Sequence, residues 1–147
     1  MTEIRKYSPT QVPKNIWTEL NLPDEDSKIR AMVNSGFSVE LLNKTARTLG
    51  LSTALVTQSL KIAGMTLSRR RKVGHFNQEE SDRFFRLIEV TNRATVLFEG
   101  DQRAALHWMQ TSVPALGNKK PIEMLHTSAH TLAVLKLITR LEFGVHP

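Results

Sequence analysis

The spacing of apolar residues in the first half of the chain constrains the fold more than any other feature. Four of them recur at intervals of three and four residues: Val39, Leu42, Ala46 and Leu49. This is the spacing of one buried helix face and not the alternation of a strand. Gly50 follows, and glycine suits the left-handed residue after a helix C-terminus. The sequence therefore predicts a short helix followed by a tight turn.

Two more short helices are predicted after this turn. Ser52 is a suitable N-cap for a helix over about residues 53–60. The apolar stripe of that helix is Leu55, Val56 and Leu60. A third helix is predicted over about 64–72, with Leu67 facing inward and Gly74 ending it. Three short helices joined by tight turns are typical of a helix-turn-helix motif.

Charge points to a polyanionic partner for this region. The formal net charge is +6, and no Asp or Glu occurs between Glu40 and Glu79. Seven basic residues fall in that interval: Lys44, Arg47, Lys61, Arg69, Arg70, Arg71 and Lys72. Each phosphate that a cation neutralises releases condensed counterions, so one-sided basic character favours nucleic acid binding. The alternative is a solvated basic face without a partner.

The register of the motif decides which helix would read DNA. In the preferred register the third helix reads, because Val56, Leu60, Ile62 and Leu67 fill the core offsets. Its predicted DNA-binding residues are Met65, Thr66, Arg69 and Arg70, which point outward, with Arg71 and Lys72 on backbone phosphates. A second register uses Ala46, Gly50 and Val56 and makes residues 53–62 the reading helix. It leaves the basic run without a role.

The second half of the chain is also predicted to be helical. Asn77 and Glu80 have the spacing of a capping box, and the apolar residues after them continue to Gly100. Further helices are predicted from about Asp101, from Pro121 as a short piece, and from Thr127 or Ser128 to about Phe143. Only residues 51–55 have any strand character, so the fold class is all-α.

Four motifs in order resemble one known family. They are Gly74-His75-Phe76-Asn77-Gln78-Glu79-Glu80-Ser81-Asp82-Arg83, then Trp108 with Pro114-Ala115-Leu116-Gly117, then Pro121-Ile122-Glu123-Met124-Leu125, and finally Arg140-Leu141-Glu142-Phe143-Gly144-Val145. Residues 36–147 thereby resemble the Xre/MbcA/ParS-type antitoxins of bacterial RES-Xre toxin-antitoxin pairs. Lys61 and Gly64 depart from the family pattern at the start of the third helix.

The resemblance implies a function as well as a fold. It implies a Cro-like helix-turn-helix domain over 36–76 that binds double-stranded operator DNA, and a toxin-binding helical domain over 77–147. The prolines at 9, 13 and 23, and not the resemblance, predict that residues 1–35 form an irregular N-terminal arm. The toxin of this family consumes NAD, and the antitoxin neutralises it and represses its own operon. A homodimer or a toxin-antitoxin hetero-oligomer is expected. The runner-up is a stand-alone regulator whose second domain only dimerises.

The last helix is the predicted toxin-binding element. Apolar residues cover much of its surface, which is typical of a helix that is buried in its own domain or meets a partner. The residues expected to contact toxin are Leu135, Ile138, Arg140, Glu142, Gly144, Val145, His146 and Pro147. The tail after Gly144 is expected to leave the helix and contact the toxin near its NAD pocket.

No chemistry of its own is predicted for this chain. His126 and His130 have the spacing of a zinc pair, but a third ligand is not evident, so no metal site is predicted. His107 beside Trp108 is interpreted as structural, and no nucleophile-base order or phosphate-binding loop occurs. No cofactor is expected. The absence of cysteine and of a long apolar run favours a cytoplasmic protein that does not cross a membrane.

Overall fold

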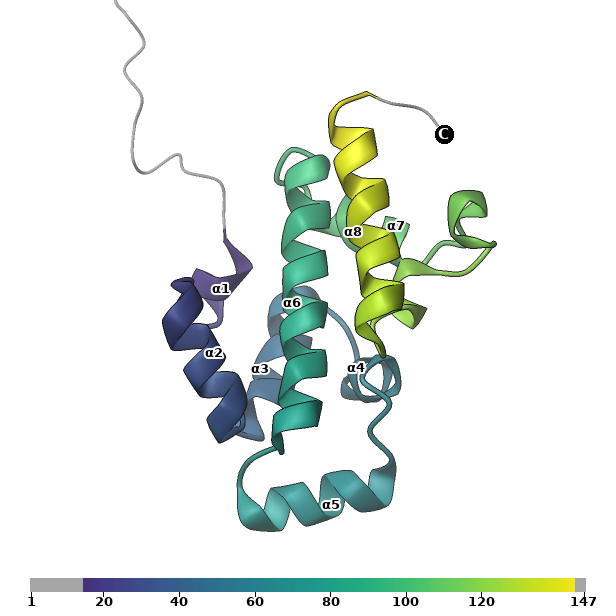
Figure 1. Ribbon diagram of the computed structural model, residues 1–147. Coiled ribbons are helices and arrows are strands. Elements are labelled where there is room, and N and C mark those ends of the chain that lie inside the picture. Colours follow the sequence, from purple (N-terminus) through teal and green to yellow (C-terminus); the bar gives the residue numbers. More distant parts are fainter. Residues whose placement is uncertain (1–14, 145–147) are drawn as a thin grey trace, which may run out of the picture.

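The computed structural model describes residues 15–144, which fold as an all-α structure (Figure 1). Within this range the α-helices are α1 (Ile16–Glu19), α2 (Asp26–Ser35), α3 (Glu40–Leu49), α4 (Thr53–Ser59), α5 (Gly64–Val73), α6 (Gln78–Leu97), α7 (Gln102–Met109) and α8 (Ser128–Glu142). Two single turns of 3-10 helix, η2 (Pro114–Leu116) and η3 (Pro121–Glu123), lie between α7 and α8. The predicted fold class is confirmed.

The three predicted short helices are present as α3, α4 and α5. Gly50, after α3, has a φ of 67°, the left-handed value expected there. The Ser52 side chain accepts a hydrogen bond from the Leu55 backbone at 3.0 Å and so caps α4. Gly74 ends α5 with a φ of 98°. The local signals fixed these boundaries to within one or two residues, and the arrangement is consistent with a helix-turn-helix.

Helix α6 is the central element of the molecule. It runs between α1 and α2 on one side and α7 and α8 on the other (Figure 1). Its start carries the predicted capping box, in which Asn77 and Glu80 bond to each other's backbone N–H. Its core positions are fully buried, among them Phe84, Leu87 and Ile88. Both halves of the chain therefore fold against one helix.

Residues 16–35 form packed helices, where an irregular arm was predicted. The short turn α1 buries Ile16 and Trp17. Helix α2 was not predicted, because among its ten residues only Ile29 is buried and its other positions are mostly polar. Its helical start is favoured by Asp26, an acidic residue in the first turn. The rest of the predicted arm, residues 1–14, lies outside the described range.

The buried residues of the two halves form a single core. Phe84 of α6 contacts Phe76, with ring centroids 5.3 Å apart, and Phe37 in an edge-to-face contact at 6.3 Å. Trp17 of α1 contacts Phe85 at 5.4 Å. The short helix predicted at Pro121 is only the turn η3, but it buries Ile122 against the same core. The boundary predicted after residue 76 thus cuts through one continuous core.

Candidate functional site

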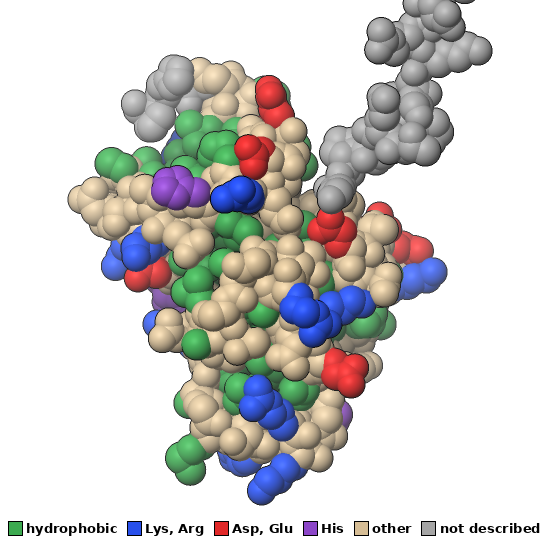
Figure 2. Space-filling view, turned by 180° about the vertical axis from the view of Figure 1, so that it is seen from behind, with side chains coloured by type: hydrophobic (Ala, Val, Ile, Leu, Met, Phe, Trp, Pro, Cys, Tyr) green, Lys and Arg blue, Asp and Glu red, His purple; other side chains and the backbone are tan. Residues whose placement is uncertain are grey.

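Helix α5 lies across one end of the molecule and buries none of its own residues (Figure 1). Met65 and Val73 are 85% and 60% exposed, which is unusual for large apolar side chains. The space-filling view shows Lys and Arg side chains gathered at this same lower end (Figure 2). Seven of its ten residues are exposed to solvent.

The inward and outward sides of α5 can be distinguished by their contacts. Leu67 packs against the core and Arg70 bonds to α6, so these two residues mark the inward side. Successive residues of a helix turn by about 100°, which places Met65, Arg69 and Lys72 together on the opposite side. All three are exposed, as is Arg71. Thr66 is half-buried, and its hydroxyl accepts a hydrogen bond from Arg69 Nη2 at 3.4 Å.

Arg70 was predicted to point outward, but it points inward toward α6. Its Nε donates to Glu80 Oε1 at 2.7 Å, and the Glu80 residue is only 5% exposed. Burial opposes ionisation of Glu80, but hydrogen bonds from Arg70 and the Asn77 backbone, with the charges of Arg70 and Arg83, hold its pKa below the usual value. Arg70 and Glu80 are ten residues apart, on two helices joined by a turn. Residue spacing within one helix therefore could not predict this contact.

The alternative register also has its core positions filled. Ala46 and Val56 are buried, and α3 packs directly against α4 across the turn at Gly50. Thr53 and Gln58 are exposed on α4. However, α4 carries no charged residue, whereas α5 carries four cations. Packing accommodates both registers, and charge distinguishes them.

The motif from Glu79 to Arg83 ties the N-terminal elements to α6. Ser81 Oγ accepts from the Phe37 backbone at 2.8 Å, and Arg83 Nη1 donates to the carbonyl of Leu60 at the end of α4 at 3.0 Å. Glu79 pairs with Arg83 one helical turn later. These side chains act as structural links within the molecule.

The predicted toxin-binding residues fall into different environments. Ile138 is fully buried and is not available to a partner, because it packs into the core from α8. Leu135 is half-buried, and Arg140 and Gly144 are exposed. Glu142 Oε1 accepts from Arg93 Nη2 of α6 at 3.2 Å and so has an internal partner. Val145, His146 and Pro147 lie outside the described residues.

An apolar groove between α6 and α8 was not predicted. Its apolar lining includes Phe85 from α6 and Leu132 and Leu135 from α8, and its volume is about 600 Å³. Leu132 remains 50% exposed beside it. Forty-seven positions separate Phe85 from Leu132, so their meeting depends on the tertiary fold. Asp82 also lines the groove and pairs with Arg86, another lining residue.

Comparison with known proteins identifies this arrangement. Residues 93–144 match the family model of the antitoxin Xre/MbcA/ParS C-terminal toxin-binding domain. Antitoxin Xre of Yersinia enterocolitica serotype O:8 / biotype 1B is 34% identical over 146 residues, covering 97% of this chain and 99% of that protein. Antitoxin Xre of Photorhabdus laumondii subsp. laumondii is 32% identical over 149 residues, with the same coverage. The chain belongs to the Xre antitoxin family.

The resemblance drawn from the four motifs is therefore confirmed, and the chain is an antitoxin of a toxin-antitoxin system. The matched segment of the Xre antitoxin domain begins near the end of α6 and includes all of α8. Leu132, Leu135 and Arg140 lie within it, whereas α5 lies outside it. Among the helices of residues 15–144, none is long and apolar enough to cross a membrane.

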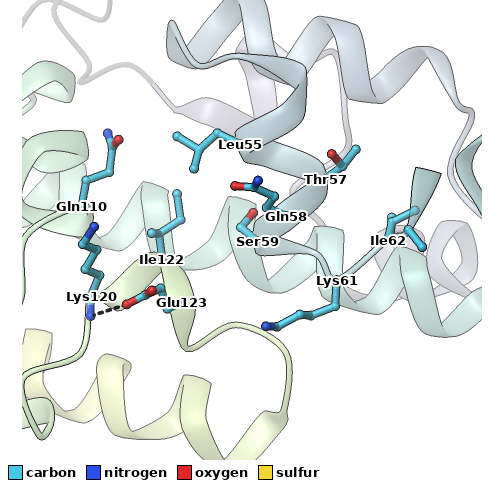
Figure 3. A pocket seen from close by; sticks show the side chains of 11 residues that line it. Leu55, Thr57, Gln58, Ser59, Lys61, Ile62, Gln110, Lys120, Ile122 and Glu123 are labelled. Carbon is cyan, nitrogen blue, oxygen red and sulfur yellow. Dashed lines mark hydrogen bonds between the residues drawn. The ribbon is translucent and has the colours of Figure 1, made fainter.

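This Xre antitoxin also has an open cleft of about 690 Å³ between its two halves (Figure 3). Side chains of α4 line one wall, and residues between Gln110 and Glu123 line the other. Glu123 is the carboxylate in the cleft, and it accepts from the Lys120 backbone at 3.1 Å as a cap of η3.

The histidine pair has a structural arrangement. The rings of His126 and His130 lie 4.6 Å apart, and each Nδ1 contacts a neighbouring oxygen, Glu123 O or Thr127 Oγ1. Within residues 15–144, no three His, Asp or Glu side chains are placed to hold a metal ion. The spacing of the two histidines is that of a zinc pair, but no described residue is placed beside them as a third ligand.

Proposed function

We propose that this antitoxin neutralises a NAD-consuming RES-type toxin and represses its own operon by binding double-stranded DNA. The observation that carries the proposal is the separation of two exposed surfaces. One is the cationic outer side of α5, and the other is the apolar groove of α6 and α8, partly within the toxin-binding domain match. Each surface suits a different class of partner.

The outer side of α5 has the chemistry of a DNA contact. Arg69 and Lys72 are exposed cations on this side, and Arg71 is an exposed cation at its flank; all three can neutralise phosphates or reach base edges. Met65 offers an exposed apolar group, which can contact a thymine methyl in the major groove. A helix that packs few of its own side chains can enter a groove without losing core contacts.

The DNA test compares α5 with α4. We expect Arg69→Ala to weaken binding to the DNA upstream of the gene by about 1–3 kcal/mol if it contacts a base. Arg71→Ala and Lys72→Ala should each reduce the slope of log affinity against log salt by about 0.9. The matched controls are Thr53→Ala and Gln58→Ala on α4. A larger loss from these controls would assign DNA reading to α4 instead.

The groove of α6 and α8 has the chemistry of a protein contact. Leu132 and Leu135 provide apolar surface, and Arg140, one turn further along α8, adds an exposed cation at its rim. Apolar patches surrounded by charge are typical of protein-binding surfaces. Within this proposal, the tail from Gly144 to Pro147 extends from the end of α8 into the toxin.

The toxin test has two parts. The antitoxin is co-expressed with the product of the adjacent gene, and the mass of the purified complex is measured; a complex with that protein is expected. NAD consumption by the bound toxin is then compared for the full chain and for a chain lacking Gly144 to Pro147. We expect the truncated chain to bind but to restore part of the NAD consumption. A mass equal only to antitoxin multimers would favour the stand-alone regulator.

A further inference from the structure

Few contacts hold helix α5 against the rest of the molecule. None of its ten residues is buried, so packing alone gives it little orientation. Its C-terminal end is joined by the Gly74 carbonyl, which accepts from the Val39 backbone at 3.1 Å. Leu67 adds a partly buried contact. Among the side chains of α5, Arg70 makes the ion pair to α6, with Glu80.

The Glu80 side chain is held by the capping box in addition to its contact with Arg70. The carboxylate oxygen that accepts from Arg70 also accepts from the Asn77 backbone at 2.9 Å, and the Glu80 backbone donates to Asn77 Oδ1 at 2.7 Å. The side chain is 7% exposed, compared with 23% for Arg70. Glu80 is thus a buried acceptor that the capping box holds at the start of α6.

We infer that Glu80 is a positioning residue for DNA binding: it holds Arg70, and thereby orients α5 so that Met65, Arg69 and Lys72 face the duplex. The inference rests on the proposed function. It goes beyond that function in two ways. DNA affinity depends on Glu80, a carboxylate that does not contact DNA, and Arg70 positions α5 instead of contacting DNA directly.

The sign of one mutational effect distinguishes this role from simple electrostatics. A carboxylate close to a phosphate-binding helix repels DNA, so its removal on charge grounds alone tightens binding. If Glu80 positions α5, its removal weakens binding although the protein becomes more positive. The two accounts therefore predict opposite signs.

The experiment uses the full chain and a duplex of the DNA immediately upstream of its own coding sequence. Glu80→Gln removes the charge and keeps a capping box, since Gln serves at that position. We expect it to weaken binding by about three- to thirty-fold. The matched control is Glu79→Gln, which makes the same charge change one residue earlier, at a 78% exposed side chain paired with Arg83 and not with α5. The control should bind equally or slightly more tightly.

A second variant keeps the test decisive if Glu80→Gln lowers helicity. Arg70→Gln leaves the capping box intact, and we expect weaker binding with an unchanged salt slope. The double variant should bind no more weakly than either single variant, because both remove the same link. A salt slope lowered by about 0.9 in Arg70→Gln would make Arg70 a phosphate contact and overturn the inference. Tighter binding by Glu80→Gln would also overturn it.

Arg69→Ala separates failure of the inference from failure of the proposed function. If Arg69→Ala weakens DNA binding and Glu80→Gln binds like Glu79→Gln, only the positioning role is wrong. If Arg69→Ala and the other α5 variants all bind like the unmodified chain, α5 does not contact DNA and both proposals fail. Every variant should still bind toxin, because none of the substituted residues lines the α6–α8 groove.

Discussion

Two shielded carboxylates of α6 experience opposite surroundings. Glu80 meets Arg70 and the Asn77 backbone, and its pKa lies below the usual value. Glu89 lies beside the apolar groove, and burial raises its pKa by more than the charge of Arg93 lowers it, while the charge of Asp26 adds a smaller increase. The Glu80 charge stabilises the fold above its unfolded pKa, and this contribution is lost as pH falls through the folded pKa. For Glu89 the sign is reversed.

Glu89→Gln should therefore stabilise the chain near neutral pH. The raised folded pKa means that ionised Glu89 is less favourable in the folded state, so its penalty is complete above that pKa and disappears as pH falls to the unfolded value. We expect the melting temperature to rise by roughly 2–4 °C near neutral pH and by much less at about pH 4. Thermal melts of both proteins at both pH values measure this. An equal gain at both pH values would attribute the effect to packing.

Leu132→Asp should weaken toxin binding with little change in stability. The residue is 50% exposed, so the unbound chain loses little when it becomes polar, whereas a desolvated interface would bury an unpaired charge. We expect a loss of about tenfold or more in affinity, measured by calorimetry or surface capture. Val96→Asp is the matched control: Val96 is 53% exposed and lies within residues 93–144, but it does not line the groove. Equal losses would move the interface away from the groove.

Single residues also show what sequence patterns could and could not predict. Ser52 and Asn77 act on backbone atoms within three residues, so their capping roles were readable from the sequence. Arg70 was assigned to the wrong side of α5, because its partner lies beyond a turn. Ile138 was assigned to a partner although it is buried, since an apolar helix looks the same whether its own domain or another protein covers it.

At the scale of elements, local signals predicted the helices whose ends have caps. Helices α3 to α6 and α8 each begin or end at a residue with a distinct capping preference, and their positions are confirmed. Helix α2 lacks a side-chain cap and has a single buried residue, so neither signal was available. The α6–α8 groove could not be predicted because it exists only when two distant helices pack.

Two glycines provide a matched test of how the elements are joined. Gly36, between α2 and α3, has a φ of 95°, and a Cβ there would lie 2.1 Å from the Phe76 carbonyl oxygen. We expect Gly36→Ala to cost about 1–3 kcal/mol from backbone strain alone, with a further cost from this clash. Gly64, at the start of α5, has open space around it, and Gly64→Ala should gain up to about 1 kcal/mol.

Urea unfolding of the two variants measures both effects as shifts of the midpoint at constant slope. The comparison controls for the chemical change, since each variant adds one methyl group to a glycine. A Gly36→Ala variant as stable as the unmodified chain would mean that the segment joining α2 to α3 moves away from residues 75 and 76 without cost.

At the scale of the whole molecule, the shared core predicts one cooperative unit. Phe84 is fully buried, and its aromatic partners Phe37 and Phe76 precede the boundary predicted after residue 76. A fragment of residues 77–147 loses both. We expect this fragment to bind a hydrophobic dye and to unfold without a sharp transition, whereas the full chain unfolds in one transition. Calorimetry of the two proteins is the measurement, and a sharp transition in the fragment would establish two independent domains.

The absence of buried residues in α5 also affects how the sequence of such a protein can change during evolution. A core side chain can change only when its neighbours tolerate the new shape, but the outer positions of α5 have no such neighbours. Substitutions there are nearly free of cost to folding, provided that the inward link is kept. Under the proposed function, duplicated copies in one genome could therefore acquire separate operators by changing a few outward residues, while every copy keeps the same scaffold and the same proposed surface for its toxin.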